Sequence, residues 1–146
     1  MTPSAPPRVA ALDASVLLRY LLADDPEQSP AARALVESDA PLAVTPVTIA
    51  EAAWVLANPR HRVDRVAIAD ALLAFLARDN VFCIGFDKSE AQAALLRCRS
   101  SVGADFGDAL TAACARSAGI SEIFTFDSHF GRAGISPVTP PQPRGS

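Results

Sequence analysis

The most constraining feature of this sequence is an alternation of short apolar runs with longer segments of helical periodicity. Each apolar run is only three or four residues long, as in a buried strand, and the segments between the runs repeat apolar side chains at helical spacing. This alternation is typical of βαβ units, whose consecutive strands run parallel beneath covering helices. We expect strands at residues 9–12, 42–44, 81–84 and 123–126, with a short fifth strand near Val138.

The segments between these runs predict helices with identifiable ends. Thr45 and Pro46 supply a capping hydroxyl and a proline at the first helical position, so a helix should follow them directly. Gly119 is suited to ending the last long helix. The expected helices cover residues 14–22, 30–37, 47–56, 63–76, 89–99 and 106–117. The chain is therefore predicted to belong to the α/β class.

The size of the chain limits its organisation to one domain. Its 146 residues, half of them apolar, are enough for one hydrophobic core and too few for two ordinary domains. We place that domain at residues 9–139 and expect the proline-containing ends, 1–8 and 140–146, to be extended or disordered. Charged residues interrupt every apolar stretch, which predicts no membrane span and no signal peptide, and hence a cytoplasmic protein. Cys83, Cys98 and Cys114 lack close pairs, so we expect reduced core thiols.

Four acidic residues follow predicted strands or begin predicted helices. Asp13 and Asp127 come directly after the first and fourth strands, Glu51 lies in the helix after the second strand, and Asp108 lies in the first turn of helix 106–117. In an open α/β sheet these places lie at one edge, outside the carboxyl ends of the strands. We therefore expect the four carboxylates to meet there.

Each acid also has a purely structural interpretation. Asp13, Asp105 and Asp127 are suited to capping helices, and Glu51 stands three residues after Thr48, as in a capping box. Gathered together, however, four carboxylates would repel one another unless a cation held them ionised. Oxygen ligands without histidine or cysteine suit Mg²⁺ or Mn²⁺. The set as a whole predicts a divalent-metal site.

The segments that carry these acids resemble the PIN-domain family, and more narrowly the VapC toxins of bacterial toxin–antitoxin modules. The resemblance lies in residues 12–21 (LDASVLLRYL), 48–51 (TIAE), 105–110 (DFGDAL) and 124–127 (FTFD), in the family's order and at its usual intervals. It extends over nearly the whole domain, from Val9 to about Val138. It implies a three-layer α/β/α sandwich with a central, mainly parallel sheet.

The resemblance also implies a function and a set of site residues. Asp13, Glu51, Asp108 and Asp127 match the family's catalytic, metal-binding acids, which hold Mg²⁺ or Mn²⁺ and cut RNA phosphodiester bonds. Asp105 matches an additional acid, and Ser15 and Thr125 are auxiliary residues expected to orient neighbouring acids. The implied partners are an RNA substrate, a cognate antitoxin protein and a second copy in a homodimer.

The residues that would contact RNA are less evident, because the net charge is −3 and no basic surface is obvious. Arg60, Arg62 and Arg65 form the densest basic cluster, and Arg19 is a further candidate. His61 and His129 are expected at the surface, and Trp54 is expected in the core.

Two other functions remain open at this stage. An aspartyl-nucleophile phosphatase also carries an Asp after its first strand, but such enzymes usually place a second Asp two residues later, where this chain has Ser15. An inactive PIN-type module that binds RNA or protein is the other alternative, and the presence of all four acids argues against it. A P-loop nucleotide binder is excluded, because its phosphate-binding motif is missing.

Overall fold

The computed structural model describes residues 8–100 and 104–145. The expectations for residues 1–7 and for residue 146 lie outside the described residues. The long helices are α1 (Ala14–Leu22), α2 (Gln28–Val36), α3 (Pro46–Ala57), α4 (Arg65–Leu76), α5 (Lys88–Arg99) and α6 (Phe106–Ser117). Each agrees with a helix predicted from the sequence to within two residues at either end. Thr45 caps α3 as expected, with its hydroxyl accepting a hydrogen bond from the Thr48 N–H.

The strands are short and pair in parallel. They are β1 (Ala10–Ala11), β2 (Leu42–Val44), β3 (Val81–Cys83), β4 (Glu122–Phe124) and β5 (Ser136–Val138). The prediction of an α/β protein with a mainly parallel sheet is confirmed. The strands nevertheless divide into two sheets, ordered β1-β2-β3 and β4-β5, where the sequence predicted one. Strands of two or three residues form few ladder hydrogen bonds, so helix packing decides where each strand lies.

The hydrophobic core lies between the first sheet and the helices. All three residues of β2 are buried, and α3 and α4 pack their apolar sides into the same cluster. Its largest fully buried members include Leu17, Ile49, Leu72 and Phe75. Asn80 holds the segment that leads into β2. Its side-chain amide donates hydrogen bonds to the Val36 and Ala40 carbonyls.

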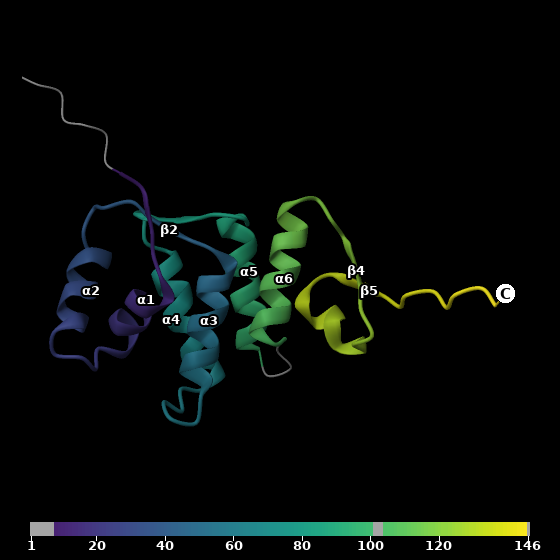
Figure 1. The fold of residues 1–146 in the computed structure, drawn as a ribbon, viewed down its shortest axis with the longest axis horizontal. Helices are drawn as coiled ribbons and strands as arrows, with labels where there is room; N and C mark the ends of the chain where they lie inside the picture. The colour runs from purple at the N-terminus through teal and green to yellow at the C-terminus, as the bar shows by residue number, and fades with distance from the viewer. Residues whose placement is uncertain (1–7, 101–103, 146) are drawn as a thin grey trace, which may run out of the picture.

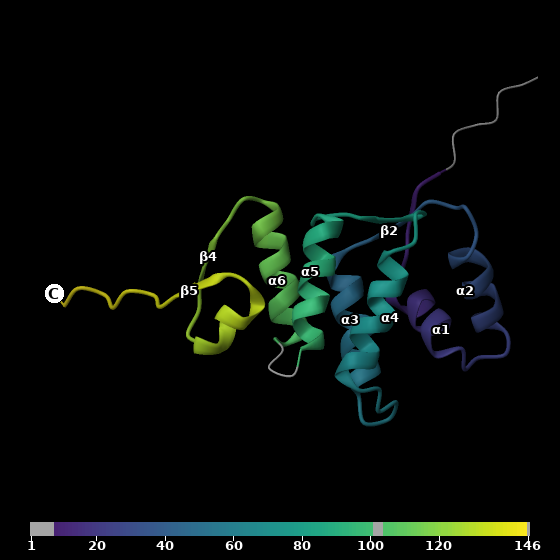
Figure 2. The same ribbon diagram turned by 180° about the vertical axis from the view of Figure 1, so that it is seen from behind.

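The C-terminal part of the chain forms a separate unit on the far side of α6. This C-terminal unit consists of β4, the 3₁₀ helix η1 (Ser128–Ala133) and β5. Figures 1 and 2 place it at one end of the long axis, with α3, α5 and α6 between it and the N-terminal segment that contains β1. Helix η1 was not predicted. Residues 140–145 continue past β5 without helix or strand.

Several single-residue predictions can be compared with the structure. Trp54 was predicted in the core, and this was wrong: its side chain is 73% exposed, on the outer side of α3 together with Val47. Helix α3 is apolar on most of its circumference, so its sequence does not indicate which side faces the core. The three cysteines are free, with Cys98 buried and the other two half-buried. In the part of the chain that the structure describes, every helix is too short or too polar to cross a bilayer.

Candidate active site

Asp13 lies directly after β1, at the N-terminus of α1. Its carboxylate accepts hydrogen bonds from the Ser15 hydroxyl at 2.5 Å and from the Ser15 backbone N–H at 3.1 Å. These two bonds hold the pKa of Asp13 below its ordinary value, the hydroxyl having the larger effect. Asp13 therefore caps its helix, and Ser15 fixes the direction of its carboxylate.

Glu51 lies on α3, exposed to solvent in the second turn of the helix. Because Thr45 is the capping residue, Glu51 is too far along the helix to form a capping box with Thr48. The Thr48 hydroxyl instead donates to the Leu12 carbonyl at 3.4 Å. This bond brings the first turn of α3 to the carboxyl end of β1, where Asp13 follows.

Asp105 and Asp108 occupy the N-terminus of α6. Asp105 is the N-cap, and its carboxylate accepts a hydrogen bond from the Asp108 N–H at 3.2 Å. Gly107 leaves room for this cap, because a Cβ there would lie 3.1 Å from the Asp105 carboxylate oxygen. Partial burial raises the pKa of Asp108, and the negative charges of Asp105 and Asp127 raise that pKa further. Asp105, Asp108 and Asp127, hereafter the acid cluster, thus share one electrostatic environment.

Asp127 joins the acid cluster from the end of β4. Its backbone N–H donates to the Thr125 hydroxyl at 2.9 Å, and its carboxylate accepts from the His129 N–H at 2.8 Å. The His129 backbone bond is the largest cause of a lowered pKa for Asp127, and the imidazole, 3.2 Å away, adds to it. His129 is exposed as predicted, but its contact with an acid of the site was not foreseen. The only signal for this contact in the sequence was that His129 lies two residues after Asp127.

The predicted acids are only partly brought together. The acid cluster lies by α6 and the C-terminal unit, whereas Asp13 and Glu51 lie on α1 and α3. Across residues 8–100 and 104–145, no three acidic, histidine or cysteine side chains converge closely enough to hold a metal ion. The acids are apart because the two sheets are apart: Asp13 comes after β1 in the first sheet, and Asp127 comes after β4 in the second. The joint metal site therefore remains a prediction.

The predicted RNA contacts lie in different surroundings. Arg19 and Arg60 line a cavity of about 360 Å³ that also contains Ser15 and His61, so positive charge adjoins the residue that orients Asp13. Arg19 is itself held by Asp24 at 3.1 Å. The sequence indicated Arg19 and Arg60 as candidate RNA contacts but did not indicate His61. The only signal for His61 was its position next to Arg60. The Arg62 guanidinium donates to the Pro59 carbonyl, and Arg65 is exposed at the start of α4.

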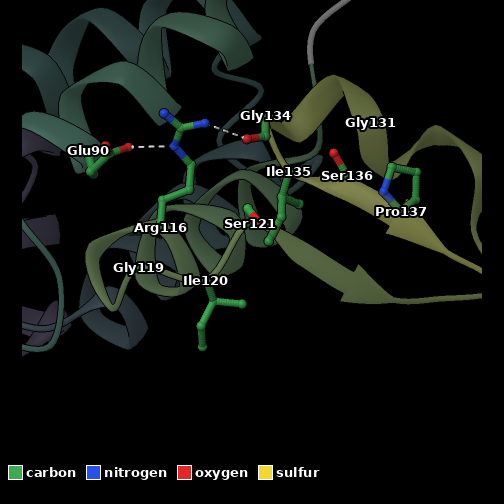
Figure 3. A pocket seen from close by; sticks show the side chains of 10 residues that line it. All are labelled: Glu90, Arg116, Gly119, Ile120, Ser121, Gly131, Gly134, Ile135, Ser136 and Pro137. Carbon is green, nitrogen blue, oxygen red and sulfur yellow. Dashed lines mark hydrogen bonds and ion pairs between the residues drawn. The ribbon is translucent and has the colours of Figure 1, made fainter.

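A larger cavity lies at the junction of α5 and α6 with the C-terminal unit. Its volume is about 530 Å³, and Arg116 crosses it to bind both sides (Figure 3). The Arg116 guanidinium donates to the Glu90 carboxylate at 3.0 Å and to the Gly134 carbonyl at 2.9 Å. Gly134 has a φ of +91°, a conformation that residues with a side chain rarely adopt, so glycine is favoured at this position. The Arg116 bridge thus fastens the C-terminal unit to the helices.

Comparison with known proteins identifies a family. The model of the family described as the PIN domain matches residues 10–135, a range that contains every acid discussed above. A search of curated proteins and a search of solved structures returned no match.

Proposed function

We propose, on the premise that this chain belongs to the PIN-domain family, that it is a ribonuclease dependent on a divalent metal ion. Family membership indicates a nuclease-type function, and the match over residues 10–135 is the observation that carries the proposal. RNA is the substrate class that we assign. Asp13, Glu51, Asp108 and Asp127 are the proposed catalytic and metal-binding residues, with Asp105, Ser15 and Thr125 in support.

The chemistry of the acid cluster suits a hard divalent cation, although its three acids do not converge on one point in the described residues. Their donor atoms are carboxylate and hydroxyl oxygens, the ligands that Mg²⁺ and Mn²⁺ prefer. Asp108 is partly buried and lies in the negative field of Asp105 and Asp127, a crowding of like charges that a cation would relieve. When bound, such an ion supplies Lewis-acid chemistry, because it withdraws charge from the phosphate that is cut.

The chain's own residues have distinct roles in this proposal. Ser15 keeps the Asp13 carboxylate in one direction, and Thr125 and His129 fix the backbone and carboxylate of Asp127. Arg19 and Arg60, in the cavity beside Ser15, are placed to attract the RNA backbone next to Asp13. Asp24 neutralises Arg19 in this cavity, so Arg60 is the residue that would lessen the repulsion of RNA by a net charge of −3.

Removal of one central acid tests the proposal. We expect the purified protein to cleave total RNA with Mg²⁺ or Mn²⁺, and EDTA to abolish cleavage. Asp108→Asn should lower the rate at least about 100-fold while the melting temperature changes little. Asp39→Asn is the matched control, since Asp39 is an exposed acid outside the site. Cleavage that persists in EDTA would contradict the metal requirement, and RNA binding without cleavage would indicate an inactive binding module.

The biological role that we propose is that of the toxin in a toxin–antitoxin pair, inhibited by a small antitoxin protein. Induced expression should then slow growth, and the Asp108→Asn variant should not. Co-expression of the adjacent small gene product should restore growth. Normal growth at high levels of an active enzyme would instead assign the protein to RNA processing.

A further inference from the structure

The cavity that Ser15 shares with Arg19 and Arg60, hereafter the Ser15 cavity, combines apolar side chains with polar ones. Leu18, Leu22 and Val55 form its apolar part and are half-buried, whereas most of its polar residues are exposed. Its volume of about 360 Å³ falls in the usual range of sites for small molecules. A site of this kind holds a partly apolar group and orients it through a few polar contacts.

The Ser15 cavity adjoins one of the acids proposed to bind metal. The Ser15 hydroxyl lines the cavity and donates to the Asp13 carboxylate at 2.5 Å. A phosphate bound at Asp13 would therefore place the neighbouring nucleotide of the same strand at this cavity. Proteins that read RNA sequence take up unpaired bases, stack them on planar side chains and hydrogen-bond their edges. An RNA base is thus the occupant favoured here, an inference that rests on the proposed function.

Arg19 fixes the orientation of the Gln28 amide, and both residues line the cavity. The Arg19 Nε–H donates to the Gln28 side-chain oxygen at 2.9 Å. Because an arginine can only donate, the amide oxygen must face Arg19, and the amide nitrogen is left to donate elsewhere. The Arg19 guanidinium is itself held by the Asp24 carboxylate, 3.1 Å from its Nη1.

Arg19 and Gln28 together keep two donors available. Within residues 8–100 and 104–145, the Gln28 amide nitrogen and the Arg19 Nη2 have no hydrogen-bond partner. The Nη2 group lies on the same side of the planar guanidinium as Nε, and hence beside the amide that Nε binds. The Ser15 cavity therefore offers two neighbouring donors.

Two neighbouring donors distinguish guanine from the other bases. Guanine carries two adjacent acceptors, O6 and N7, and a pair of donors on this edge is the commonest specific contact to a base. The corresponding edges of adenine and cytosine carry an amino group, which would face a donor, and that of uracil has a single carbonyl. In paired RNA this edge lies in a deep, narrow groove that side chains cannot read, so the base must be unpaired.

The loop after α3 completes the cavity with a ring and a positive charge. Arg60 and His61 line the cavity, and His61 supplies the only aromatic ring among the described residues around it. The Asn58 carbonyl accepts hydrogen bonds from the His61 and Arg62 N–H groups at 2.9 Å each, and Arg62 has a φ of +52°. A loop held in such a strained turn is already ordered before a ligand binds, which lowers the cost of binding.

We propose that the Ser15 cavity binds one unpaired guanine of the RNA substrate, next to the bond that is cut. The Gln28 amide nitrogen and the Arg19 Nη2 donate to N7 and O6 of the base. His61 stacks on the base, and Arg60 attracts the adjoining phosphate. Gln28 is thereby the residue that selects the base.

Binding of short RNA tests the pocket without relying on cleavage. All proteins carry Asp108→Asn, so that the RNA stays intact, and fluorescence anisotropy measures the affinity for cytidine hexamers with one substituted base. A hexamer with one guanosine should bind at least about fivefold tighter than one with adenosine, a purine of nearly the same size. Inosine keeps O6 and N7 and should match guanosine. The analogue 7-deazaguanosine lacks N7 and should lose most of the preference.

Substitution of Gln28 should remove the choice of base. Gln28→Glu keeps the shape of the side chain and its bond to Arg19, but it replaces the free donor with an acceptor. The guanosine hexamer should then bind no tighter than the adenosine hexamer. Gln92→Glu is the matched control, since it makes the same change of charge on α5, and it should keep the preference. Equal binding of the two hexamers before substitution, or a preference that survives Gln28→Glu, would overturn the pocket.

The stacking role of His61 has its own measurement. His61→Ala should weaken the binding of both hexamers at least about fivefold and leave their ratio unchanged, because stacking does not depend on the base. His61→Phe should restore the affinity. Unchanged affinities in His61→Ala would overturn this role.

Cleavage of total RNA with Mg²⁺ separates this inference from the proposed function. The unmodified protein should cut next to guanosines, and Gln28→Glu should lose that preference when the ends are mapped. Cleavage at all bases alike, with equal binding of the hexamers, would overturn the pocket and leave the proposed function standing. Guanosine-selective binding without cleavage would support the pocket and overturn the nuclease. The absence of both binding and cleavage would overturn both.

Discussion

The two sheets of this molecule have the same parallel pairing and very different surroundings. The first, β1-β2-β3, has a fully buried central strand and contributes to the hydrophobic core. The second, β4-β5, is exposed at Glu122 and Phe124 and is fastened to α5 and α6 through Arg116. Burial of its own residues stabilises the first sheet, whereas the second is positioned by Phe130, Ala133 and Ile135, which pack into the core, together with the Arg116 bridge. Neither β4 nor β5 contains a buried residue, so the strand that leads to Asp127 is held in place by its neighbours.

Truncation of one apolar side chain in each region should give the largest difference. Leu72 is fully buried, so Leu72→Ala should lower the free energy of unfolding by about 2–5 kcal/mol. Phe126 is 85% exposed, so Phe126→Ala in dilute protein should change it by less than about 0.5 kcal/mol. Urea denaturation followed by circular dichroism measures both. Equal losses would mean that Phe126, like Leu72, is buried in solution.

Removal of the Arg116 bridge should have a smaller, local effect. Arg116→Ala loses an ion pair and a hydrogen bond at the surface, which together contribute about 1 kcal/mol. Hydrogen exchange should become faster in residues 122–138 and stay unchanged in β2. Arg132→Ala is the control, since Arg132 is an exposed arginine of η1 in the same unit. Faster exchange throughout the chain would contradict a separately fastened unit.

The smallest expected effect concerns the acid stability of the N-terminal region. The Gln28 and Glu27 N–H groups donate to Asp25 and lower its pKa, Gln28 having the larger effect. A lowered folded-state pKa stabilises the protein above the ordinary value of 3.8, and this contribution is lost as pH falls through the lower folded-state value. Asp25→Asn should therefore reduce the decline of the urea midpoint below about pH 4. An unchanged pH profile would contradict this role.

The sequence predicted well whatever depends on local chemistry. Thr45 and Pro46 began α3, and the caps at Asp13 and Asp105 could be recognised because a short polar side chain before an apolar helix has few other uses. The positions of Asp13 and Asp127 after strands were also predicted correctly. These features need only the residues within one helical turn.

What the sequence did not predict depends on contacts between distant segments. Nothing in residues 9–12 or 123–126 indicates which other strand each segment pairs with. The division into two sheets was therefore not foreseen. Trp54 was misplaced because α3 is apolar almost all round. The proximity of Asp127 to Asp108, and its distance from other acids of the set, likewise depend on how the C-terminal unit packs.

The exposed side chains of Phe124 and Phe126 have a consequence for handling the protein. Large apolar side chains in contact with water promote self-association, so a concentrated preparation should aggregate more readily than a variant with polar residues at both positions.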